Sequence, residues 1–499
     1  MAKVVIIGGG VAGLAAGIYA RKSGYDCEIY EKHFITGGQC TGWNRGGYHI
    51  DNCVHWLTGT SPDTDIHRVW REVGVLADDI DIIRHKLFLQ VRQDGKVLNV
   101  WSDLDRFADE MTAIAPEDRR QIRHFVKMLK AFSHMDMPAL KPAEQMTFAD
   151  KMRFLRKCWR LIPYAVRYNG VSLPDYVSRF RSSVVRAIIS SYLPATFNVI
   201  SIVYMYATFL SGNGAMPRGG SMALTKRMET RFRQLGGKVF TRHEAKQVSI
   251  EGNRLRSVTF ADGTTVEADN FIFACDTRVT FDLLGDKYMD SFFRKRYADI
   301  DTYPVFSNFN VYLAADSRCE DLPDMLIFSC RPFSIVGRDH DRIVLKNFNY
   351  EPSFAPEGHT VLQVLMVQDA ADFDRWQHLY TTDREAYRAE KARAAAAIVE
   401  RIVELEPHYA GHLKVIETVS PYSFHRYCGA YKGAYMSFIS THKTERELHN
   451  GRVAGLDNVY LSGQWIQPPG GLPNALVSGR FAVQRMCKVD GTEFVSDCK

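Results

Sequence analysis

The ten cysteines of this chain show no paired spacing, and no CxxC motif occurs anywhere in the sequence. A zinc site and a disulfide framework therefore have no support, no metal ligands are expected, and reduced thiols in a cytoplasmic protein explain the cysteines best. One alternative stays open for Cys40 and Cys53. These two residues are thirteen positions apart and lie on either side of the Gly46–Asp51 segment, where a redox pair is conceivable.

Long hydrophobic runs are also missing. The most apolar segment, 197–210, is interrupted by Asn198 and Ser201 and is too short to cross a bilayer, so it predicts a buried helix beside an apolar cavity. An apolar strand already begins at Val4, which leaves no room for a signal peptide. The net charge of +6 is modest and no nucleic-acid-binding motif accompanies it, so nucleic acid is not an expected partner.

The N-terminal residues instead form a dinucleotide-binding pattern. Val4–Ile7 predicts a short buried strand, Leu14–Ser23 predicts a helix, and Cys27–Tyr30 predicts a second strand that ends on Glu31. The glycine-rich segment Gly8–Gly13 lies between the first strand and the helix. The carboxylate of Glu31 is placed to accept hydrogen bonds from a ribose. This arrangement predicts a bound dinucleotide and leaves FAD and NAD open.

Each glycine of the pattern has a separate task. Gly8 permits a tight turn, Gly10 lets the backbone approach a pyrophosphate, and Gly13 lets the helix pack closely on the strand. The pyrophosphate is expected over Val11 and Ala12, because the unpaired N–H groups and the dipole of a helix N-terminus attract an anion.

Further motifs follow at both ends of the chain: Thr36–Gln39, Gly46–Asp51, Val459–Gln464, Pro468–Pro473 and Asn474–Arg480. Together with the N-terminal pattern, they resemble the FAD-dependent family of phytoene desaturases, carotenoid isomerases and retinol saturases, a relative of the flavin amine oxidases. The resemblance is faint between the motif-bearing blocks.

The resemblance implies FAD as cofactor and hydride transfer at flavin N5. It adds these cofactor-binding residues to those of the N-terminal pattern: Lys32, Gly37, Gly38, Gln39, Val248, Gly463, Gln464, Gly471 and Leu472. In the family, Val248 would give its backbone amide and carbonyl to the adenine. Gln464 stands where amine oxidases often have an acid, and its amide can still bond flavin hydroxyls.

The candidate catalytic residues are His55, Trp56 and Tyr431. His55 lies in a stretch that in the family passes near the flavin ring, where a histidine is able to donate a proton. A structural histidine bonded to backbone, and aromatic residues that merely line a core or pocket, account for the same positions.

The expected fold is α/β. Residues 1–75, 213–280 and 451–499 are expected to form a Rossmann-like FAD-binding domain, interwoven with a substrate-binding domain from 76–212 and 281–450. The substrate domain is expected to be a mixed sheet roofed by helices, with the substrate between sheet and flavin.

Residues 151–167 carry six basic side chains and no acid. Met152, Leu155, Trp159 and Ile162 lie close to one helical stripe among them, a pattern typical of a helix on an anionic membrane surface. A solvated basic helix packed on the substrate domain is the alternative interpretation. A peripheral contact with the inner face of a membrane is therefore one of two expectations for this segment.

The sequence predicts an FAD-dependent oxidoreductase that acts on C–C or C=C bonds of an apolar isoprenoid, carotenoid, retinoid or lipid. Desaturase, saturase and isomerase stay open, because all three need the same geometry at flavin N5. Two alternatives remain: a flavin amine oxidase acting on a small amine, and a flavin- or lipid-binding protein without turnover. The electron partner is not predicted.

Overall fold

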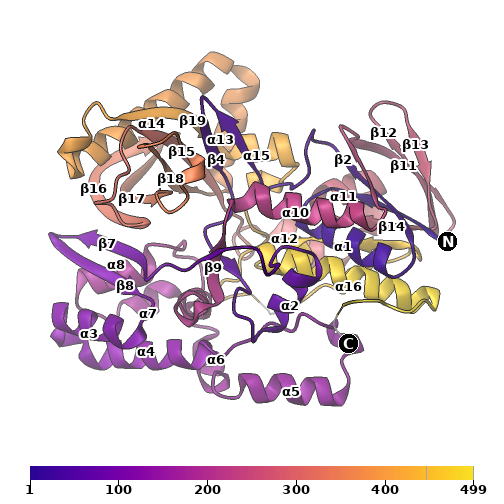
Figure 1. Ribbon diagram of the computed structural model, residues 1–499, viewed down its shortest axis with the longest axis horizontal. Helices are drawn as coiled ribbons and strands as arrows, with labels where there is room; N and C mark the ends of the chain where they lie inside the picture. Colours follow the sequence, from indigo (N-terminus) through magenta and orange to yellow (C-terminus); the bar gives the residue numbers. More distant parts are fainter. Residues whose placement is uncertain (445–446, 498–499) are drawn as a thin grey trace.

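The computed structural model describes residues 1–444 and 447–497 and shows an α/β protein built around two large sheets (Figure 1). The first sheet has five strands, all parallel. In spatial order they are β10 (Lys238–Thr241), β2 (Asp26–Glu31), β1 (Lys3–Ile7), β14 (Asn270–Phe273) and β20 (Val459–Leu461). Strands β1 and β2 of this sheet, with the helix between them along the chain, are the predicted strand–helix–strand unit, so that prediction is confirmed.

Three helices cover one face of the parallel sheet: α1 (Val11–Lys22), α10 (Gly220–Gln234) and α16 (Leu472–Asp490). Glycines allow α1 to approach both neighbours. A Cβ at Gly17 would lie 2.8 Å from the Phe232 ring of α10, and one at Gly479 would lie 2.4 Å from the Ala12 carbonyl oxygen. The chain therefore brings its N- and C-terminal motifs together through close helix packing.

The opposite face of the parallel sheet packs on a three-stranded antiparallel sheet made of β11 (Ala245–Glu251), β12 (Arg254–Phe260) and β13 (Thr265–Glu267). Because side chains alternate along a strand, Val5 and Phe271 face this second layer, whereas Val4 and Ile272 face the helices. Helices α11 (Thr277–Leu284) and α12 (Ser291–Ala298) extend the same layer.

The second large sheet has seven strands and is mixed, since only the β16–β7 pair is parallel. Its spatial order is β19 (Leu413–Val419), β15 (Ser307–Ala315), β18 (Thr360–Gln368), β17 (Arg338–Asn347), β16 (Met325–Ile335), β7 (Leu87–Gln93) and β8 (Lys96–Trp101). Helices α13 (Ala370–Thr382) and α14 (Arg384–Leu405) pack on one face of this sheet, and α15 (Pro421–Cys428) follows its edge strand β19 (Figure 1).

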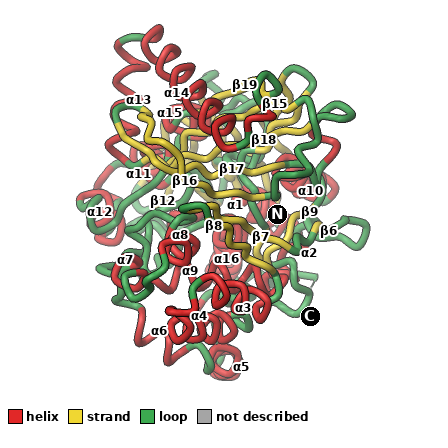
Figure 2. The backbone as a smooth tube through the Cα atoms, turned by 90° about the vertical axis from the view of Figure 1, so that its left-hand side faces the viewer, coloured by secondary structure: helices red, strands yellow, loops and turns green. Residues whose placement is uncertain are grey.

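A helical layer lies below the β7–β8 end of the mixed sheet, as Figure 2 shows. It consists of α3 (Leu104–Ile114), α4 (Arg119–Phe132), α5 (Phe148–Cys158), α6 (Ile162–Tyr168), α7 (Leu173–Val177), α8 (Ser183–Ser190) and α9 (Val199–Thr208). The predicted buried helix at 197–210 is α9, which packs into this layer. No helix in the described part of the chain combines the length and the apolar character that crossing a bilayer requires.

Short elements connect the two halves. They are β3 (Gly42–Arg45), β4 (Tyr48–Asp51), β5 (Leu57–Thr58), β6 (Ile82–Ile83), β9 (Gly214–Pro217) and α2 (Asp65–Glu72).

Most predicted strands and helices are present. The N-cap of α14 is Asp383, whose carboxylate accepts from the Glu385 and Ala386 amides. Thr382 and Glu385 match the sequence pattern of a capping box, but that prediction is wrong, because Thr382 ends the preceding helix. The domain boundaries stay a prediction.

Candidate functional site: a flavin-sized cavity with an apolar extension

A cavity of about 1780 Å³ runs between the parallel sheet and the mixed sheet and reaches α9. Typical ligand pockets measure roughly 300–1,000 Å³, so this cavity has room for a large cofactor and a second molecule. One end is lined by the glycine-rich loops at Gly8, Gly10 and Gly37. The other end is lined by apolar side chains.

The glycine-rich loops form a cradle at the end of β1. Gly8 has φ +106°, a left-handed backbone that favours glycine, and a Cβ at Gly13 would lie 1.9 Å from the Gly8 carbonyl oxygen. Gly10 differs from both, because a Cβ there would come no closer than 3.8 Å to the Gly37 carbonyl oxygen. The Gly37 amide donates to the Gly9 carbonyl at 2.9 Å, which ties the two loops together. Space above Gly10 is thus left open toward the cavity.

Glu31 closes the cradle from the end of β2. One carboxylate oxygen accepts from the Gly9 amide at 2.7 Å and the other accepts from the His33 amide at 2.8 Å. Burial raises the pKa of this carboxyl, against the lowering effect of those amides. Glu31 lines the cavity, and each oxygen retains a lone pair for a further donor. The assignment of Glu31 to a ribose stays a prediction.

Glu31→Ala should lower cofactor affinity by about 1.5–3 kcal/mol, because a charge-assisted acceptor is removed. Flavin fluorescence titration of the apoprotein measures this change. Glu251→Ala is the matched control, since Glu251 is an exposed acid in the β11–β12 hairpin outside the cavity. An unchanged dissociation constant for Glu31→Ala would remove Glu31 from the cofactor site.

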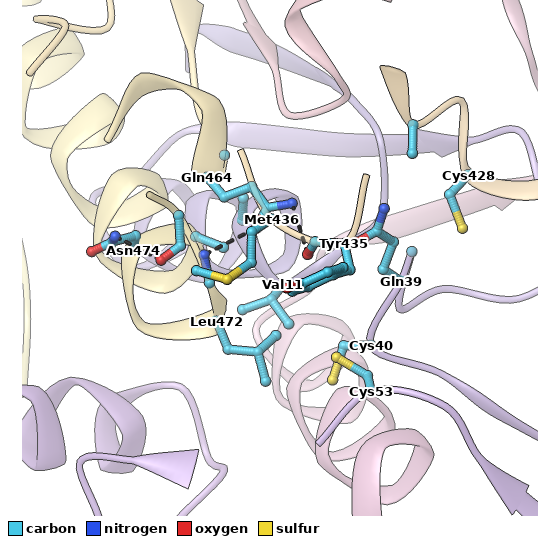
Figure 3. A pocket seen from close by; sticks show the side chains of 18 of the residues that line it. Val11, Gln39, Cys40, Cys53, Cys428, Tyr435, Met436, Gln464, Leu472 and Asn474 are labelled. Atoms are coloured by element: carbon cyan, nitrogen blue, oxygen red, sulfur yellow. Dashed lines mark hydrogen bonds between the residues drawn. The ribbon is translucent and has the colours of Figure 1, made fainter. Parts of the chain in front are cut away.

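The C-terminal motif supplies the opposite wall (Figure 3). The Gln464 side-chain oxygen accepts from the Gly471 amide at 3.0 Å, and its nitrogen donates to the Tyr435 carbonyl at 3.4 Å. Gly463 at the end of β20 donates its amide to the Ser478 hydroxyl at 2.7 Å. Gln464 therefore holds the turn that leads into α16, a role that the sequence pattern did not predict.

The cavity wall fits a dinucleotide with a flavin ring. The N-termini of α1 and α16 both lie on it, with Val11 and Ala12 from one helix and Gly471 and Leu472 from the other. Neither helix has a side-chain cap at its N-terminus, so amides are left for an external anion. The α1 end fits a pyrophosphate, and the α16 end fits the edge of a flavin that gains negative charge on reduction.

Other predicted cofactor residues lie on the same wall. The cavity lining includes Lys32, Gly38 and Gln39. The side-chain nitrogen of Gln39 donates to the Ala434 carbonyl at 2.7 Å. Val248 does not belong to the lining, since it pairs with Val258 inside the β11–β12 hairpin. The part of that hairpin that the cavity reaches is Glu244 and Ala245, and the Val248 contact stays a prediction.

Two of the three candidate catalytic residues, His55 and Trp56, line the cavity. Burial, followed by the charge of Lys346, lowers the pKa of His55 well below its ordinary value, so the imidazole is neutral near pH 7. Its buried Nδ1 has no hydrogen-bond partner among the described residues, which does not match a histidine bonded to backbone through that atom. The Trp56 ring packs edge-on to Phe88 at a centroid distance of 5.8 Å.

Tyr431 is placed differently from the other two. Its amide donates to the Asp276 carboxylate at 2.8 Å, and its ring packs on Tyr297 outside the cavity lining. Tyr435 and Met436, four and five residues further along, point into the cavity instead (Figure 3). The tyrosine-rich sequence did not distinguish these positions, because the intervening 3-10 turn decides which ring faces inward.

The far end of the cavity is largely apolar. Side chains from the helical layer and the mixed sheet line it together: Phe132, Leu161, Ala165, Leu193, Phe197, Ile200, Met205, Val344, Leu365 and Val367. Tyr192 and Tyr204 add aromatic surface, and burial raises the pKa of both hydroxyls. This end suits an uncharged, elongated molecule.

Comparison with known proteins agrees with this geometry. The family model for flavin containing amine oxidoreductase matches residues 11–487. The zeta-carotene-forming phytoene desaturase of Myxococcus xanthus is similar at 23% identity over 524 residues, which covers 97% of this chain and 93% of that protein. The 4,4'-diaponeurosporene oxygenase of Staphylococcus haemolyticus is 22% identical and covers 98% of both chains.

Solved structures share the fold. An oxidoreductase from Methanosarcina mazei aligns with a TM-score of 0.59 at 15% identity, over 97% of this chain and 99% of that one. Putrescine oxidase bound to putrescine aligns with a TM-score of 0.60 at 15% identity, over the same shares. The resemblance inferred from the motifs is confirmed. The chain therefore belongs to the family of flavin-containing amine oxidoreductases, and it is a flavin-dependent oxidoreductase whose cofactor is FAD.

Proposed function

We propose that this enzyme acts on C–C or C=C bonds of a long apolar isoprenoid, carotenoid, retinoid or lipid, by hydride transfer at flavin N5. The apolar end of the cavity carries this proposal. Its lining comes from α9 and the mixed sheet, and it continues directly from the glycine-lined end. The zeta-carotene-forming activity in the name of the similar Myxococcus xanthus protein supports the same substrate class.

Bound FAD would supply the hydride acceptor or donor, and the residues of this chain would orient both partners. The apolar wall excludes water and aligns the substrate along α9, where Ile200 and Met205 face the cavity. The N-terminus of α16 stabilises negative charge at the edge of the cofactor. Neutral His55 places no charge in the apolar site and has a ring nitrogen that can accept a proton, whereas its lowered pKa disfavours the imidazolium that would donate one.

Anaerobic spectra of the purified enzyme test the substrate class. Polyenes, retinoids or unsaturated lipids should bleach the oxidised flavin, or reoxidise the reduced flavin, whereas small amines should leave both spectra unchanged. Bleaching by amines alone, with peroxide released in air, would overturn the proposal in favour of an amine oxidase. A flavin that none of these compounds reduces or reoxidises would indicate a binding protein without turnover.

We further propose that the enzyme meets its substrate at a membrane surface through α5 and α6. The 151–167 segment forms these two short helices at the edge of the molecule (Figure 1). Phe148 is 80% exposed, Trp159 is 60% exposed and Val166 is 78% exposed, although large apolar side chains are normally buried. The remaining exposed apolar residues of this face, called here the α5–α6 patch, are Met152, Leu155 and Ile162.

The charges around the α5–α6 patch fit an anionic lipid surface. Lys151, Arg153, Arg156, Arg160 and Arg167 are exposed around it. The sixth cation of the segment, Lys157, turns toward the protein and pairs with Asp136 at 2.6 Å.

The α5–α6 patch also lies next to the substrate end of the cavity. Leu161 and Ala165 line that end, while Ile162 and Val166, one residue further along, are exposed. The helix that would enter the lipid interface is therefore also a wall of the apolar cavity, which gives a lipid-dissolved substrate a short route inward.

A further inference from the structure

Two cysteines lie next to one another on the wall of the cavity (Figure 3). Cys40 follows the Gly37–Gly38 loop, and its amide donates to the Gly37 carbonyl at 3.0 Å. Cys53 comes shortly after β4. The neighbouring Cys53 thiol contributes most to raising the pKa of the Cys40 thiol well above its ordinary value, followed by burial.

Two buried polar residues, Asp51 and Ser221, contact the two cysteines. The Asp51 carboxylate accepts from the Ser221 amide and hydroxyl, both at 2.6 Å, and from the Cys53 amide at 3.3 Å. The Cys40 thiol in turn donates to the Ser221 carbonyl at 3.7 Å. Because Asp51 and Ser221 are almost fully buried, this anchor keeps both cysteines at the same place on the wall.

Lys346 adds a positive charge close to the pair. Its ammonium donates to the Val54 carbonyl at 2.8 Å, and the charges of Asp51 and Cys53 act against the lowering of its pKa by burial. Cys53 is the more accessible of the two thiols, since Cys40 is 2% exposed and Cys53 is only partly buried.

We propose that Cys40 and Cys53 form a redox-active dithiol that exchanges electrons with the bound flavin. On oxidation the two S–H bonds break and one Sγ–Sγ bond forms. The two electrons and one of the two protons go to the oxidised flavin, which becomes the reduced anion, and the other proton leaves to solvent. In the opposite direction a reduced flavin returns two electrons to the disulfide, which takes up two protons. The pair would thus store two electrons beside the cofactor, and the proposal rests on the bound flavin and not on the proposed substrate class.

The first test needs no flavin chemistry. The purified protein is treated with diamide, its remaining thiols are alkylated, and its proteolytic peptides are analysed by mass spectrometry. We expect a peptide pair joined through Cys40 and Cys53 that separates on treatment with dithiothreitol. Absence of this linked pair after diamide treatment would overturn the proposal.

The second test counts electrons. Diamide-treated holoenzyme is titrated anaerobically with dithionite, with the flavin spectrum as readout. Wild type should take up twice as many electrons per flavin as Cys40→Ser or Cys53→Ser. Cys428→Ser is the matched control, because Cys428 lines the same cavity, and it should titrate like wild type. Equal uptake by wild type and Cys40→Ser would show that the disulfide does not exchange electrons with flavin and would overturn the proposal.

The two tests separate this inference from the proposed function. If the substrate panel fails but oxidised wild type still takes up twice the electrons of Cys40→Ser, the dithiol stands and the substrate class is wrong. If polyenes or lipids reduce the flavin while no linked peptide forms, the dithiol is wrong and the proposed function stands.

Discussion

Gly10→Val should abolish FAD binding while leaving the fold intact. A Cβ at this position meets no protein atom closer than 3.8 Å, and Gly10 has an ordinary φ of −74°, so the protein itself tolerates a side chain. The space that valine would fill lies over the N-terminus of α1, where the pyrophosphate is expected. Overpacking a rigid site costs about 3 kcal/mol, so FAD affinity should fall ~100-fold or more. Flavin absorbance per protein after purification measures the loss.

Gly170→Val is the matched control for this change. Gly170 lies in a surface turn after α6, also has open space around its Cβ position, and does not line the cavity. This variant should keep wild-type FAD content, and circular dichroism should show the same helix content for both variants. Full FAD occupancy in Gly10→Val would show that the glycine cradle does not hold the cofactor.

Reversing the charge of three arginines around the α5–α6 patch should abolish binding to anionic vesicles. Each basic residue near an anionic surface contributes about 1 kcal/mol, so replacing Arg153, Arg156 and Arg160 by Glu should weaken binding by about 3 kcal/mol or more, over 100-fold. Co-sedimentation with phosphatidylserine-containing vesicles at low salt measures this effect. Binding of wild type should also weaken as salt rises, because surface electrostatics are screened.

The control for the charge reversal is an equal change at the opposite end of the molecule. Arg384, Arg388 and Arg393 lie on α14, far from α5 in Figure 1, and their replacement by Glu should leave vesicle binding intact. The flavin spectrum should be the same in both triple variants. Failure of wild type to sediment with anionic vesicles at low salt would show that this segment is only a solvated basic face.

Local patterns explain which parts of the fold were predictable. β1, α1 and β2 follow one another within the first 31 residues, and their glycines, apolar runs and terminal acid depend only on neighbouring sequence. The hairpin of β7 and β8 was predictable for the same reason, since Asp94 and Gly95 mark its turn. By contrast, β16 was not predicted. Its parallel pairing with β7 joins segments more than 200 residues apart, and no local pattern indicates such a partner.

Side-chain roles at the site divide in the same way. The sequence indicated Glu31 and Gln464 as flavin-site residues, but not that Glu31 would accept from the Gly9 amide or that Gln464 would donate to the Tyr435 carbonyl, because these partners come from other segments of the chain. The inward position of Tyr435 and the outward position of Tyr431 are set by a short turn whose direction the composition does not reveal. The contact between Cys40 and Cys53 depends on Ser221, which comes from a third segment.

By itself, the sequence determined the dinucleotide cradle, the cofactor class and the expectation of an apolar substrate. The cradle depends on backbone conformation and on residue type, which are local properties, whereas the cofactor class and the apolar substrate followed from the resemblance of the motifs to a known family. Tertiary structure alone decided which apolar residues form the cavity wall, which face of α5 and α6 stays exposed, and which thiols meet. These depend on the packing of segments that are distant in sequence, because only the assembled core determines what each side chain contacts.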